Sequence, residues 1–481
     1  MAKNSKIRVR FAPSPTGVLH IGSARTTLFN YLFAKQNKGS FILRIEDTDK
    51  QRSKKEFEED ILDSLKWLGF QWDELYYQSE RTKIYEKYLK KLLDSGKAYK
   101  KEIIWFKNPN KKVVFDDIIR GRIEVDSEVF GDFSIAKNLK TPLYNFAAVV
   151  DDYEMKISHV IRGEDHIANT PKQILIYEAL GLKPPQWAHL PLILGPDRSK
   201  LSKRHGAVSV SEYREQGYLP EALINFMVLL GWSAQSKLDE ISPQRGGNPH
   251  EDEIFNLDQL VQKFSLEKIQ KGGAVFNVEK LDWFNGYYIR KMPLDKLTEL
   301  CIPYLIKDGL IKPDFKMEQD PPAYGGYFLK QKYIIAPTKE EISIDKLKKI
   351  IGLEQERMKK LSEAEEMTEF FFKEPKYKVK LLKWKNMDKK ELIKSLDLAY
   401  SILCDIRETD FGADKLKAIL MPEAEKFSLS AGGGADRGKL LWPLRVSLTG
   451  REKSPGPFEI GEILGKEKVL KRIKQAQKLL K

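Results

Sequence analysis

The sequence predicts an α/β protein in which a Rossmann-like, doubly wound domain is split by a crossover insert and followed by helical regions. Three observations support this fold class. Strand-like and helical patterns alternate over the first 95 residues, the alternation stops and later resumes, and the last third of the chain is mostly helical and rich in lysine. In such a sheet a nucleotide binds where the strand order reverses.

The first half of the domain has the clearest elements. Residues Ile7 to Phe11 read as a short strand, and Ile21 to Lys35 read as a helix because apolar residues recur at helical spacing. Phe41 to Ile45 is strand-like, while Lys55 to Leu68 and Ile84 to Leu93 have amphipathic helical spacing. Glycines follow these helices as expected stops.

The remaining chain is divided by changes in pattern. Alternation resumes with Tyr144 to Val150, Ile157 to Arg162 and a helix from Thr170 to Leu180, and the polar stretch Ser233 to Glu253 reads as a linker or surface loop. We therefore expect five parts: the first half of the doubly wound domain (1–95), a less regular insert (96–141), the second half (142–235), a mixed helical region (236–329) and an all-helical region (330–481).

Composition indicates a large globular protein with an anionic partner. The chain has 481 residues, which suggests about three domains. Its net charge of +14 favours a polyanion but does not identify one. Cys301 and Cys404 are far apart in apolar contexts, so we expect two buried thiols, no disulfide and no zinc knuckle. There is no apolar signal core or membrane-length apolar run, so the cytoplasm is the expected location.

A turn rich in proline and glycine joins the first strand to the first helix. Its sequence runs Pro13-Ser14-Pro15-Thr16-Gly17-Val18-Leu19-His20-Ile21-Gly22. Backbone N–H groups and the helix dipole would converge on an anion here, with His20 donating to a phosphate oxygen and Gly22 allowing close approach of adenine or ribose. A bare His-x-Gly is usually an ordinary strand-turn-helix with a surface histidine. The complete string instead favours a nucleotide site.

A second motif follows the apolar run that begins at Leu190. It is the cationic loop Lys200-Leu201-Ser202-Lys203-Arg204. Its cations would repel one another unless a triphosphate supplied the countercharge, and two mobile lysines could follow charge as pyrophosphate leaves. A solvated basic loop is the alternative for this string alone. The presence of the first motif favours the phosphate interpretation.

Together the two motifs resemble the HIGH and KMSKS signatures of class I aminoacyl-tRNA synthetases, in the versions carried by glutamyl enzymes. Ser23 in place of the last His, and Arg204 in place of the last Ser, are usual in that subgroup. The similarity covers nearly the whole chain and includes the blocks Arg10 to Gly17, Arg44 to Asp49, Tyr144 to Ala147, Val160 to Asp165, Thr170 to Gln173 and, as in the all-helical bacterial type, Pro443 to Gly450.

The resemblance implies activation of L-glutamate by ATP, accompanied by Mg²⁺, to glutamyl-adenylate, followed by transfer to the terminal adenosine of tRNA-Glu. It assigns catalysis to His20, Lys200 and Lys203. It assigns ATP binding to Pro13, Thr16, Gly17, His20, Gly22, Lys200, Leu201, Ser202, Lys203 and Arg204. Glutamate binding falls to Arg10, Ala12, Ser14, Glu46, Tyr144 and Arg162, because a carboxylate calls for arginine forks and an ammonium for an acceptor.

The resemblance also implies an RNA partner and a monomer. The insert would contact the acceptor end, residues 236–329 the tRNA stem and residues 330–481 the anticodon. Two stretches combine lysines with aromatic residues, Lys97 to Lys112 and Lys373 to Lys390, as RNA-binding surfaces do. Each could instead be a solvated basic face.

One departure from the family concerns zinc. Many bacterial relatives carry zinc-binding cysteines after the residues that match Ala98-Tyr99, whereas this chain has Lys100-Lys101-Glu102, so no zinc is expected. Two alternatives stay open: an enzyme that also charges tRNA-Gln with glutamate, and a non-catalytic tRNA-binding paralogue. Paralogues of that kind tend to lose His20 or the two lysines Lys200 and Lys203, which are all present.

Overall fold

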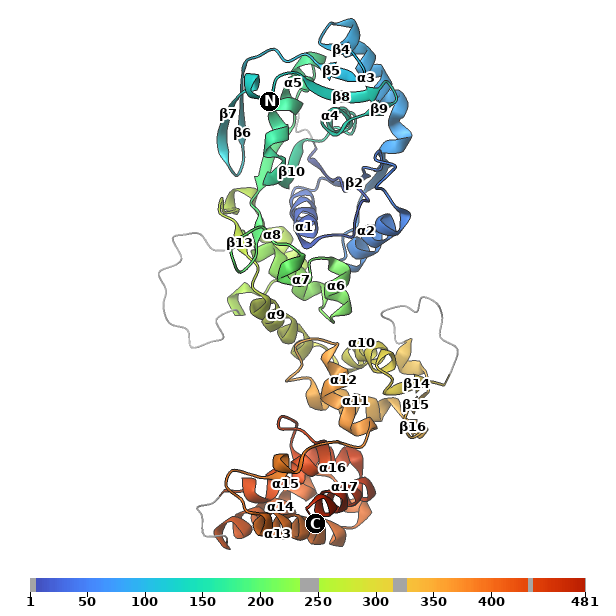
Figure 1. Cartoon of the computed structure of the whole chain (residues 1–481), viewed down its shortest axis with the longest axis vertical. Helices are drawn as coiled ribbons and strands as arrows, with labels where there is room; N and C mark the ends of the chain where they lie inside the picture. Colours follow the sequence, from blue (N-terminus) through green and yellow to red (C-terminus); the bar gives the residue numbers. More distant parts are fainter. Residues whose placement is uncertain (1–5, 234–250, 315–326, 431–435, 481) are drawn as a thin grey trace. The chain divides into compact units, whose positions relative to one another are not determined.

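The computed structural model of the chain describes residues 6–233, 251–314, 327–430 and 436–480. It separates into two compact units, Met1–Asn285 and Gly286–Lys481, which are described here in turn (Figure 1). Most of the predicted linker from Ser233 to Glu253 lies outside the described residues. Among those described, no helix is long and apolar enough to cross a membrane.

Parallel strands form the centre of the first unit. Strands β1 (Arg8–Phe11), β2 (Ser40–Ile45) and β3 (Glu74–Tyr77) pair in that order, and β10 (His159–Gly163) pairs with β11 (Gln186–Leu190). The amide of Ser158 donates to the Arg8 carbonyl oxygen at 2.9 Å, so β10 lies beside β1. The resulting order is β3-β2-β1-β10-β11: the first strands along the chain are added on one side of β1 and the later ones on its other side, as the doubly wound prediction requires.

The helices of the first unit agree largely with the sequence pattern. Helix α1 (Ile21–Gln36) packs on β1, β2 and β10, and all six residues of β2 are buried, as expected for a sheet covered on both faces. Residues 144–150, for which the sequence pattern did not distinguish strand from helix, belong to helix α4. The other helices are α2 (Lys55–Trp67), α3 (Thr82–Asp94), α4 (Tyr144–Glu154), α5 (Thr170–Leu180), α6 (Val210–Glu215), α7 (Pro220–Leu229) and α8 (Leu257–Lys263).

The insert is more regular than we predicted. Strands β4 (Ala98–Lys100), β5 (Ile104–Phe106), β8 (Phe133–Asn138) and β9 (Thr141–Pro142) form an antiparallel sheet. A hairpin of β6 (Lys112–Asp117) and β7 (Gly121–Asp126) pairs through Asp117 with Trp187 of β11. The prediction of an irregular insert was wrong because these strands are short. Exposure alternates regularly only in β6, whose odd-numbered residues are buried, and in β7, whereas β4, β5 and β9 have two or three residues each.

A hydrophobic core lies between the insert and the helices of the first unit. Buried side chains from α3, α4, α5 and the strands of the insert belong to a single cluster, which includes Tyr85, Phe106, Phe146 and Trp187. The insert is therefore fixed to the wall of the doubly wound domain. Toward the end of this unit β12 (Ile193–Leu194) pairs with β13 (Ala274–Val275).

The second unit is mainly helical, as predicted. Helix α9 (Val278–Lys291) contains the division between the units. The second unit also contains α10 (Leu294–Lys307), β14 (Ile311–Pro313), β15 (Tyr333–Ile335), β16 (Glu341–Ile342), α11 (Ile344–Glu354), α12 (Glu363–Phe372), α13 (Lys389–Asp405), α14 (Ala413–Ser430), α15 (Gly438–Thr449), α16 (Pro457–Leu464) and α17 (Lys466–Leu479).

The two cysteines differ in environment. Cys301 is buried on α10, and burial raises the pKa of its thiol. Cys404 is exposed near the end of α13, so its predicted burial was wrong. The apolar neighbours of Cys404 in the sequence belong to the buried stripe of the helix, whereas Cys404 itself lies outside that stripe, beside the buried Leu403.

Candidate active site

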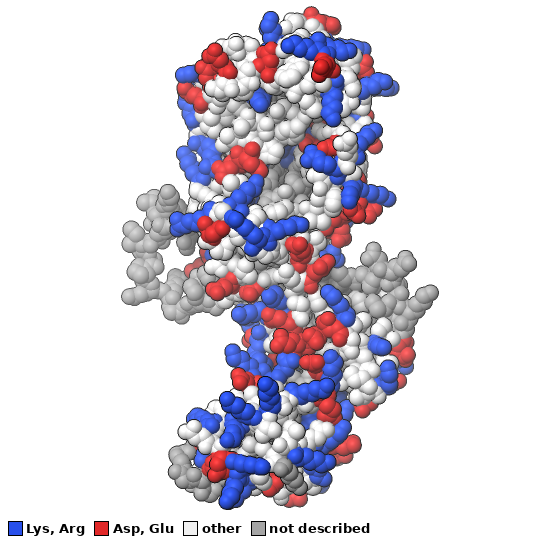
Figure 2. Space-filling view, viewed as in Figure 1, with Lys and Arg blue, Asp and Glu red and all other residues white. Residues whose placement is uncertain are grey.

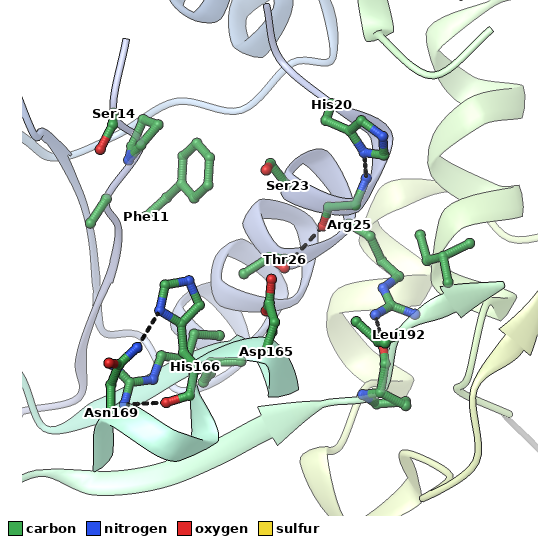
Figure 3. Close-up of a pocket in the computed structure, with 18 of the residues that line it drawn as sticks. Phe11, Ser14, His20, Ser23, Arg25, Thr26, Asp165, His166, Asn169 and Leu192 are labelled. Atoms are coloured by element: carbon green, nitrogen blue, oxygen red, sulfur yellow. Dashed lines mark hydrogen bonds between the residues drawn. The ribbon is translucent and has the colours of Figure 1, made fainter. Parts of the chain in front are cut away.

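A cavity of about 580 Å³ lies at the carboxyl ends of β1 and β10, the place where the strand order reverses. The turn after β1, the start of α1, the segment after β10 and the segment after β11 form its walls. Figure 3 shows His20 at the start of α1, with Ser14 and His166 on other walls. The lining includes these predicted site residues: Arg10, Ala12, Pro13, Ser14, His20, Gly22, Glu46, Tyr144, Arg162, Lys200 and Leu201.

Five other predicted residues do not line the cavity: Thr16, Gly17, Ser202, Lys203 and Arg204. The first two belong to the turn before α1. The last three belong to the cationic loop, where the Arg204 guanidinium pairs with Asp197 at 3.2 Å instead of facing the cavity. Lys203 is exposed at the start of the short helical turn Lys203–His205.

His20 caps the first helix with one ring nitrogen. Its Nδ1 accepts a hydrogen bond from the Gly22 amide at 3.1 Å, so the neutral ring carries its proton on Nε2. Burial, helped by the positive charge of Lys200, lowers the pKa of His20, which keeps the ring neutral at pH 7. The helix N-terminus therefore presents free backbone N–H groups and one imidazole N–H to the cavity, which is a suitable arrangement for binding phosphate.

The start of the cationic loop is tied to the segment that follows β11. The Leu201 amide donates to the Ile193 carbonyl oxygen at 2.9 Å, and the Gly195 amide donates to the Ser199 carbonyl oxygen at 2.8 Å. Gly195 is required here, because a Cβ would lie 2.7 Å from the His205 ring. Lys200 lines the cavity and its Nζ is 3.4 Å from Asp165 Oδ2, with both side chains about half exposed. This contact is weak enough for a phosphate to displace.

A buried charge network supports the opposite end of the cavity. The Asp152 carboxylate on α4 receives hydrogen bonds from Arg10 Nε at 3.1 Å and from Arg44 Nη1 at 2.7 Å. Arg44 Nη2 in turn donates to Glu46 Oε1 at 3.0 Å. The Arg44 side chain is fully buried, and it orients Glu46 at the cavity wall. Asp152 similarly orients Arg10.

Arg162 supplies a second guanidinium to this end. Its Nη2 donates to Thr170 Oγ1 at 2.7 Å, while its Nη1 is buried without a hydrogen-bond partner among the described residues. Beside it, the Tyr144 hydroxyl and His166 Nδ1 are 3.0 Å apart. Burial, together with the charge of Arg162, lowers the pKa of His166 to about 4. Because the Arg162 side chain also lines the cavity, its remaining guanidinium donor is available to an anionic ligand there.

Several residues of the site were not predicted from the sequence. Arg25, one turn into α1, lines the cavity and donates to the Leu230 carbonyl oxygen at 2.9 Å and to that of Pro191. Asp165, His166 and Asn169 also line it. Asp165 lies within a sequence block quoted above, which was the available signal. Arg44 and Asp152 act from behind the wall, and only the fold brings them together.

The predicted RNA-binding stretches lie on the surface. In the first, six lysines are exposed around β4, β5 and β6: Lys97, Lys100, Lys101, Lys107, Lys111 and Lys112. In the second, the Trp384 ring packs against Trp442 in a tilted arrangement, with ring centroids 4.9 Å apart, and its indole N–H donates to Asp436, so the N–H donor and one ring contact are used within the fold. Figure 2 shows lysine and arginine side chains across the visible face, interspersed with acidic ones.

The described residues contain no group of three or more His, Cys, Asp or Glu side chains arranged to hold a metal ion. At the cavity, cationic and N–H donor groups predominate: Arg10, Arg25, Arg162, Lys200 and the start of α1. This donor set suits a ligand with several negative charges at both ends of the cavity.

Comparisons with known proteins identify the family of the chain. A model of the catalytic domain of class I tRNA synthetases (E and Q) matches residues 6–104 and 100–283, and a model of an anticodon binding domain matches residues 296–477. The chain is 41% identical to glutamate-tRNA ligase 2 of Thermoanaerobacter pseudethanolicus and 42% identical to glutamate-tRNA ligase of Aquifex aeolicus. In both cases 98% of each chain is covered.

A solved structure gives the same result for the fold. The crystal structure of a glutamate tRNA ligase from Elizabethkingia meningosepticum, in complex with its amino acid, superposes with a TM-score of 0.77 at 32% identity and covers 99% of this chain. The chain therefore belongs to the class I aminoacyl-tRNA synthetases, in the family that comprises the glutamate and glutamine enzymes.

Proposed function

We propose that this chain is a glutamate-tRNA ligase that forms glutamyl-adenylate from ATP and L-glutamate and transfers the glutamate to the 3′-terminal adenosine of tRNA-Glu. The observation that carries the proposal is the division of one cavity. Arg10, Glu46 and Arg162 form one charged group, in which Asp152 and Arg44 join Arg10 to Glu46 and Arg162 lies within the field of Arg10. His20 and Lys200 form a second group at the start of α1, and both groups line the same cavity. The full-length relatives named above support the choice of amino acid.

In the proposed binding mode, the amino acid occupies the end supported by the buried charges. Arg162 Nη1 donates to the side-chain carboxylate of L-glutamate, and Glu46 accepts from its ammonium group. Glu46 is fixed by Arg44 and therefore faces the ligand without rearranging. L-Glutamine would leave the Arg162 donor without its countercharge, which penalises the wrong amino acid without an editing step.

Adenylate formation then needs positioning and charge stabilisation, with no side-chain nucleophile. A substrate carboxylate oxygen attacks the α-phosphorus, and pyrophosphate leaves. His20 Nε2–H donates to a phosphate oxygen, and Lys200 and Lys203 balance the charge that develops on the leaving group. Lys203 does not line the cavity, so this role requires the cationic loop to move toward ATP. Mg²⁺ enters with ATP as part of the substrate.

The tRNA would contact both units. We assign the acceptor end to the insert at residues 96–141, the stem to residues 236–329 and the anticodon to residues 330–481. The exposed lysines of the insert and the match of residues 296–477 to an anticodon binding domain support these assignments. Because related enzymes for glutamate, glutamine and arginine need tRNA before they activate the amino acid, we expect ATP–pyrophosphate exchange to require tRNA-Glu. The required concentration should rise with salt.

The test is aminoacylation with [¹⁴C]glutamate on separate transcripts of tRNA-Glu and tRNA-Gln, each at saturating ATP. Charging of tRNA-Glu alone is the expected result. Charging of both would show a non-discriminating enzyme, and charging of neither would contradict the proposal. Asp94→Asn is the control for the KM measurements on Asp→Asn variants, because Asp94 is exposed at the end of α3, outside the segments assigned to tRNA, and its change removes the same charge.

A further inference from the structure

A chain of three buried side chains connects the β6–β7 hairpin to the cavity wall. Asp117 Oδ2, at the end of β6, is 2.6 Å from His189 Nδ1 on β11. His189 Nε2 is 3.1 Å from Arg162 Nε on β10. The Asp117 and His189 side chains are fully buried, and neither residue lines the cavity. The arrangement is therefore separate from the ligand-contacting residues described above.

The Asp117 carboxylate is held in one orientation. Its Oδ1 accepts hydrogen bonds from the backbone amides of Ile119 at 3.0 Å and Arg120 at 2.8 Å. Its Oδ2 accepts from the His189 backbone amide at 3.1 Å and faces the His189 ring. Burial opposes ionisation, but the hydrogen bonds from His189 and from the Arg120 amide hold the pKa of Asp117 below its ordinary value. Asp117 is thus a carboxylate that only accepts hydrogen bonds.

This carboxylate fixes the tautomer of His189. Because Asp117 can only accept, His189 Nδ1 must donate to it. Burial lowers the pKa of His189, so the ring is neutral and Nε2 carries a lone pair. That lone pair faces two donors, Arg162 Nε and Thr170 Oγ1, each at 3.1 Å. The other tautomer would place an N–H against the Arg162 N–H.

As a consequence, two of the three guanidinium nitrogens of Arg162 have hydrogen-bond partners and one has none among the described residues. Nε is bound by His189 and Nη2 by Thr170, so the plane of the guanidinium is fixed. Nη1 is the remaining donor of a side chain that lines the cavity, and it has no hydrogen-bond partner among the described residues. Arg162 also lies over the Trp187 ring, 5.1 Å from its centroid, which restricts it further.

We propose that Asp117 and His189 are positioning residues for substrate selection: the carboxylate sets the histidine tautomer, and the histidine aims Arg162 at the carboxylate of the bound amino acid. The inference rests on the proposed function, because it takes L-glutamate as the ligand of Arg162. It adds a residue of the insert to the determinants of amino-acid binding. The preference for glutamate over glutamine depends on this orientation of Arg162, because a donor held in place cannot turn away from the NH₂ group of an amide.

Asp117→Asn tests the tautomer directly. The Ile119 and Arg120 amides donate to Oδ1, whereas the His189 amide, 3.1 Å from Oδ2, is also within 3.3 Å of Oδ1. The asparagine oxygen therefore keeps the Oδ1 position, its NH₂ group turns to His189 Nδ1, and the ring must move its proton to Nε2. We expect the KM for glutamate to rise about 10-fold or more, with the KM for ATP changed less than about 2-fold. The ratio of kcat/KM for glutamate over glutamine should fall by a similar factor.

Two further variants separate positioning from a merely structural effect. Asp94→Asn removes an exposed carboxylate at the end of α3, outside the insert, and should leave both KM values unchanged. In the Asp117→Asn background, His189→Gln should lower the KM for glutamate again, because a glutamine oxygen can accept from Arg162 Nε without any tautomer. If Asp117→Asn does not fold, His189→Leu and His189→Gln give the same comparison, with the KM raised only in the leucine variant.

A spectroscopic measurement completes the test. Long-range ¹H–¹⁵N correlation of the chain labelled at its 6 histidines should show His189, assigned by its loss in His189→Gln, as the Nδ1–H tautomer and as Nε2–H after Asp117→Asn. An Nε2–H tautomer in the wild type, or an unchanged KM for glutamate in Asp117→Asn, would overturn the inference. A wild-type protein that charges no tRNA with glutamate would instead overturn the proposed function.

Discussion

Replacing Asp152 with asparagine should destabilise the first unit and weaken its hold on the amino acid. Asp152 is the shared anion of Arg10 and Arg44, at 3.1 Å and 2.7 Å, and its side chain is 4% exposed. A charge pair near 4 Å contributes about 4 kcal/mol at an effective dielectric constant of about 20, so two pairs contribute about 8 kcal/mol. The change also removes the several kcal/mol that burial of the carboxylate costs. The net loss should be about 3–5 kcal/mol, the range typical of a broken buried ion pair.

Differential scanning calorimetry measures this loss. The transition that rises on adding ATP and L-glutamate belongs to the unit that carries the cavity, and in Asp152→Asn it should fall by about 10 °C. The KM for glutamate should rise in the same variant, because Arg10 loses its anchor. Asp116→Asn, with the same loss of charge at an exposed site, should melt like the wild type. A shift of Asp152→Asn no larger than that of Asp116→Asn would refute the network as a support of the site.

Four further predictions follow from the site. Lys203→Ala should slow adenylate formation by roughly 10²-fold while tRNA affinity is kept, and near-normal single-turnover rates would remove Lys203 from the reaction. His20→Asn keeps an oxygen for the helix cap but loses the Nε2–H donor, so it should melt like the wild type and form adenylate about as slowly as His20→Ala. His20→Ala should in addition lose about 1 kcal/mol of stability, because it loses the cap. Rapid adenylate formation by His20→Asn would assign His20 to the cap alone. His166 has a pKa of about 4 in the folded state and about 6.5 when unfolded, so the unfolded state binds protons more readily and the free energy of unfolding falls as the pH falls from 6.5 toward 4. In urea titrations, the free energy of unfolding lost between pH 7.5 and pH 5 should be about 2 kcal/mol smaller in His166→Gln than in the wild type. Equal losses in the two proteins would contradict a ring that is neutral in the fold. Elemental analysis should find substoichiometric zinc, and activity should survive chelation once Mg²⁺ is restored; one tightly bound zinc per chain would contradict this.

The doubly wound domain was predictable from the sequence because its signals are local. Helix α1 has apolar residues at regular spacing, and the strand before it is short and bounded by a proline-rich turn. The insert was not predicted as a sheet, because its strands are two to six residues long and only β6 shows clear alternation of buried and exposed residues. Cys404 shows the same limit: apolar neighbours predict a helix but not which face a residue occupies.

The nucleotide end of the cavity could be predicted in more detail than its supports. The residues of the first motif are consecutive, so their position at the start of a helix follows from the sequence itself. Arg44 and Asp152 are 108 positions apart, and Asp117 and His189 are 72 apart, so only the strand order brings each pair into contact. Charged residues of this kind resemble ordinary surface ion pairs in a sequence. Their burial is what shows their role.

A crystal structure with a non-hydrolysable glutamyl-adenylate analogue tests the central claim most directly, because it places both ends of the ligand in one measurement. The claim predicts the side-chain carboxylate of the analogue at Arg162 Nη1, its ammonium at Glu46, and its phosphate within hydrogen-bond distance of His20 Nε2. An analogue bound in the reverse orientation, or outside this cavity, would contradict the account.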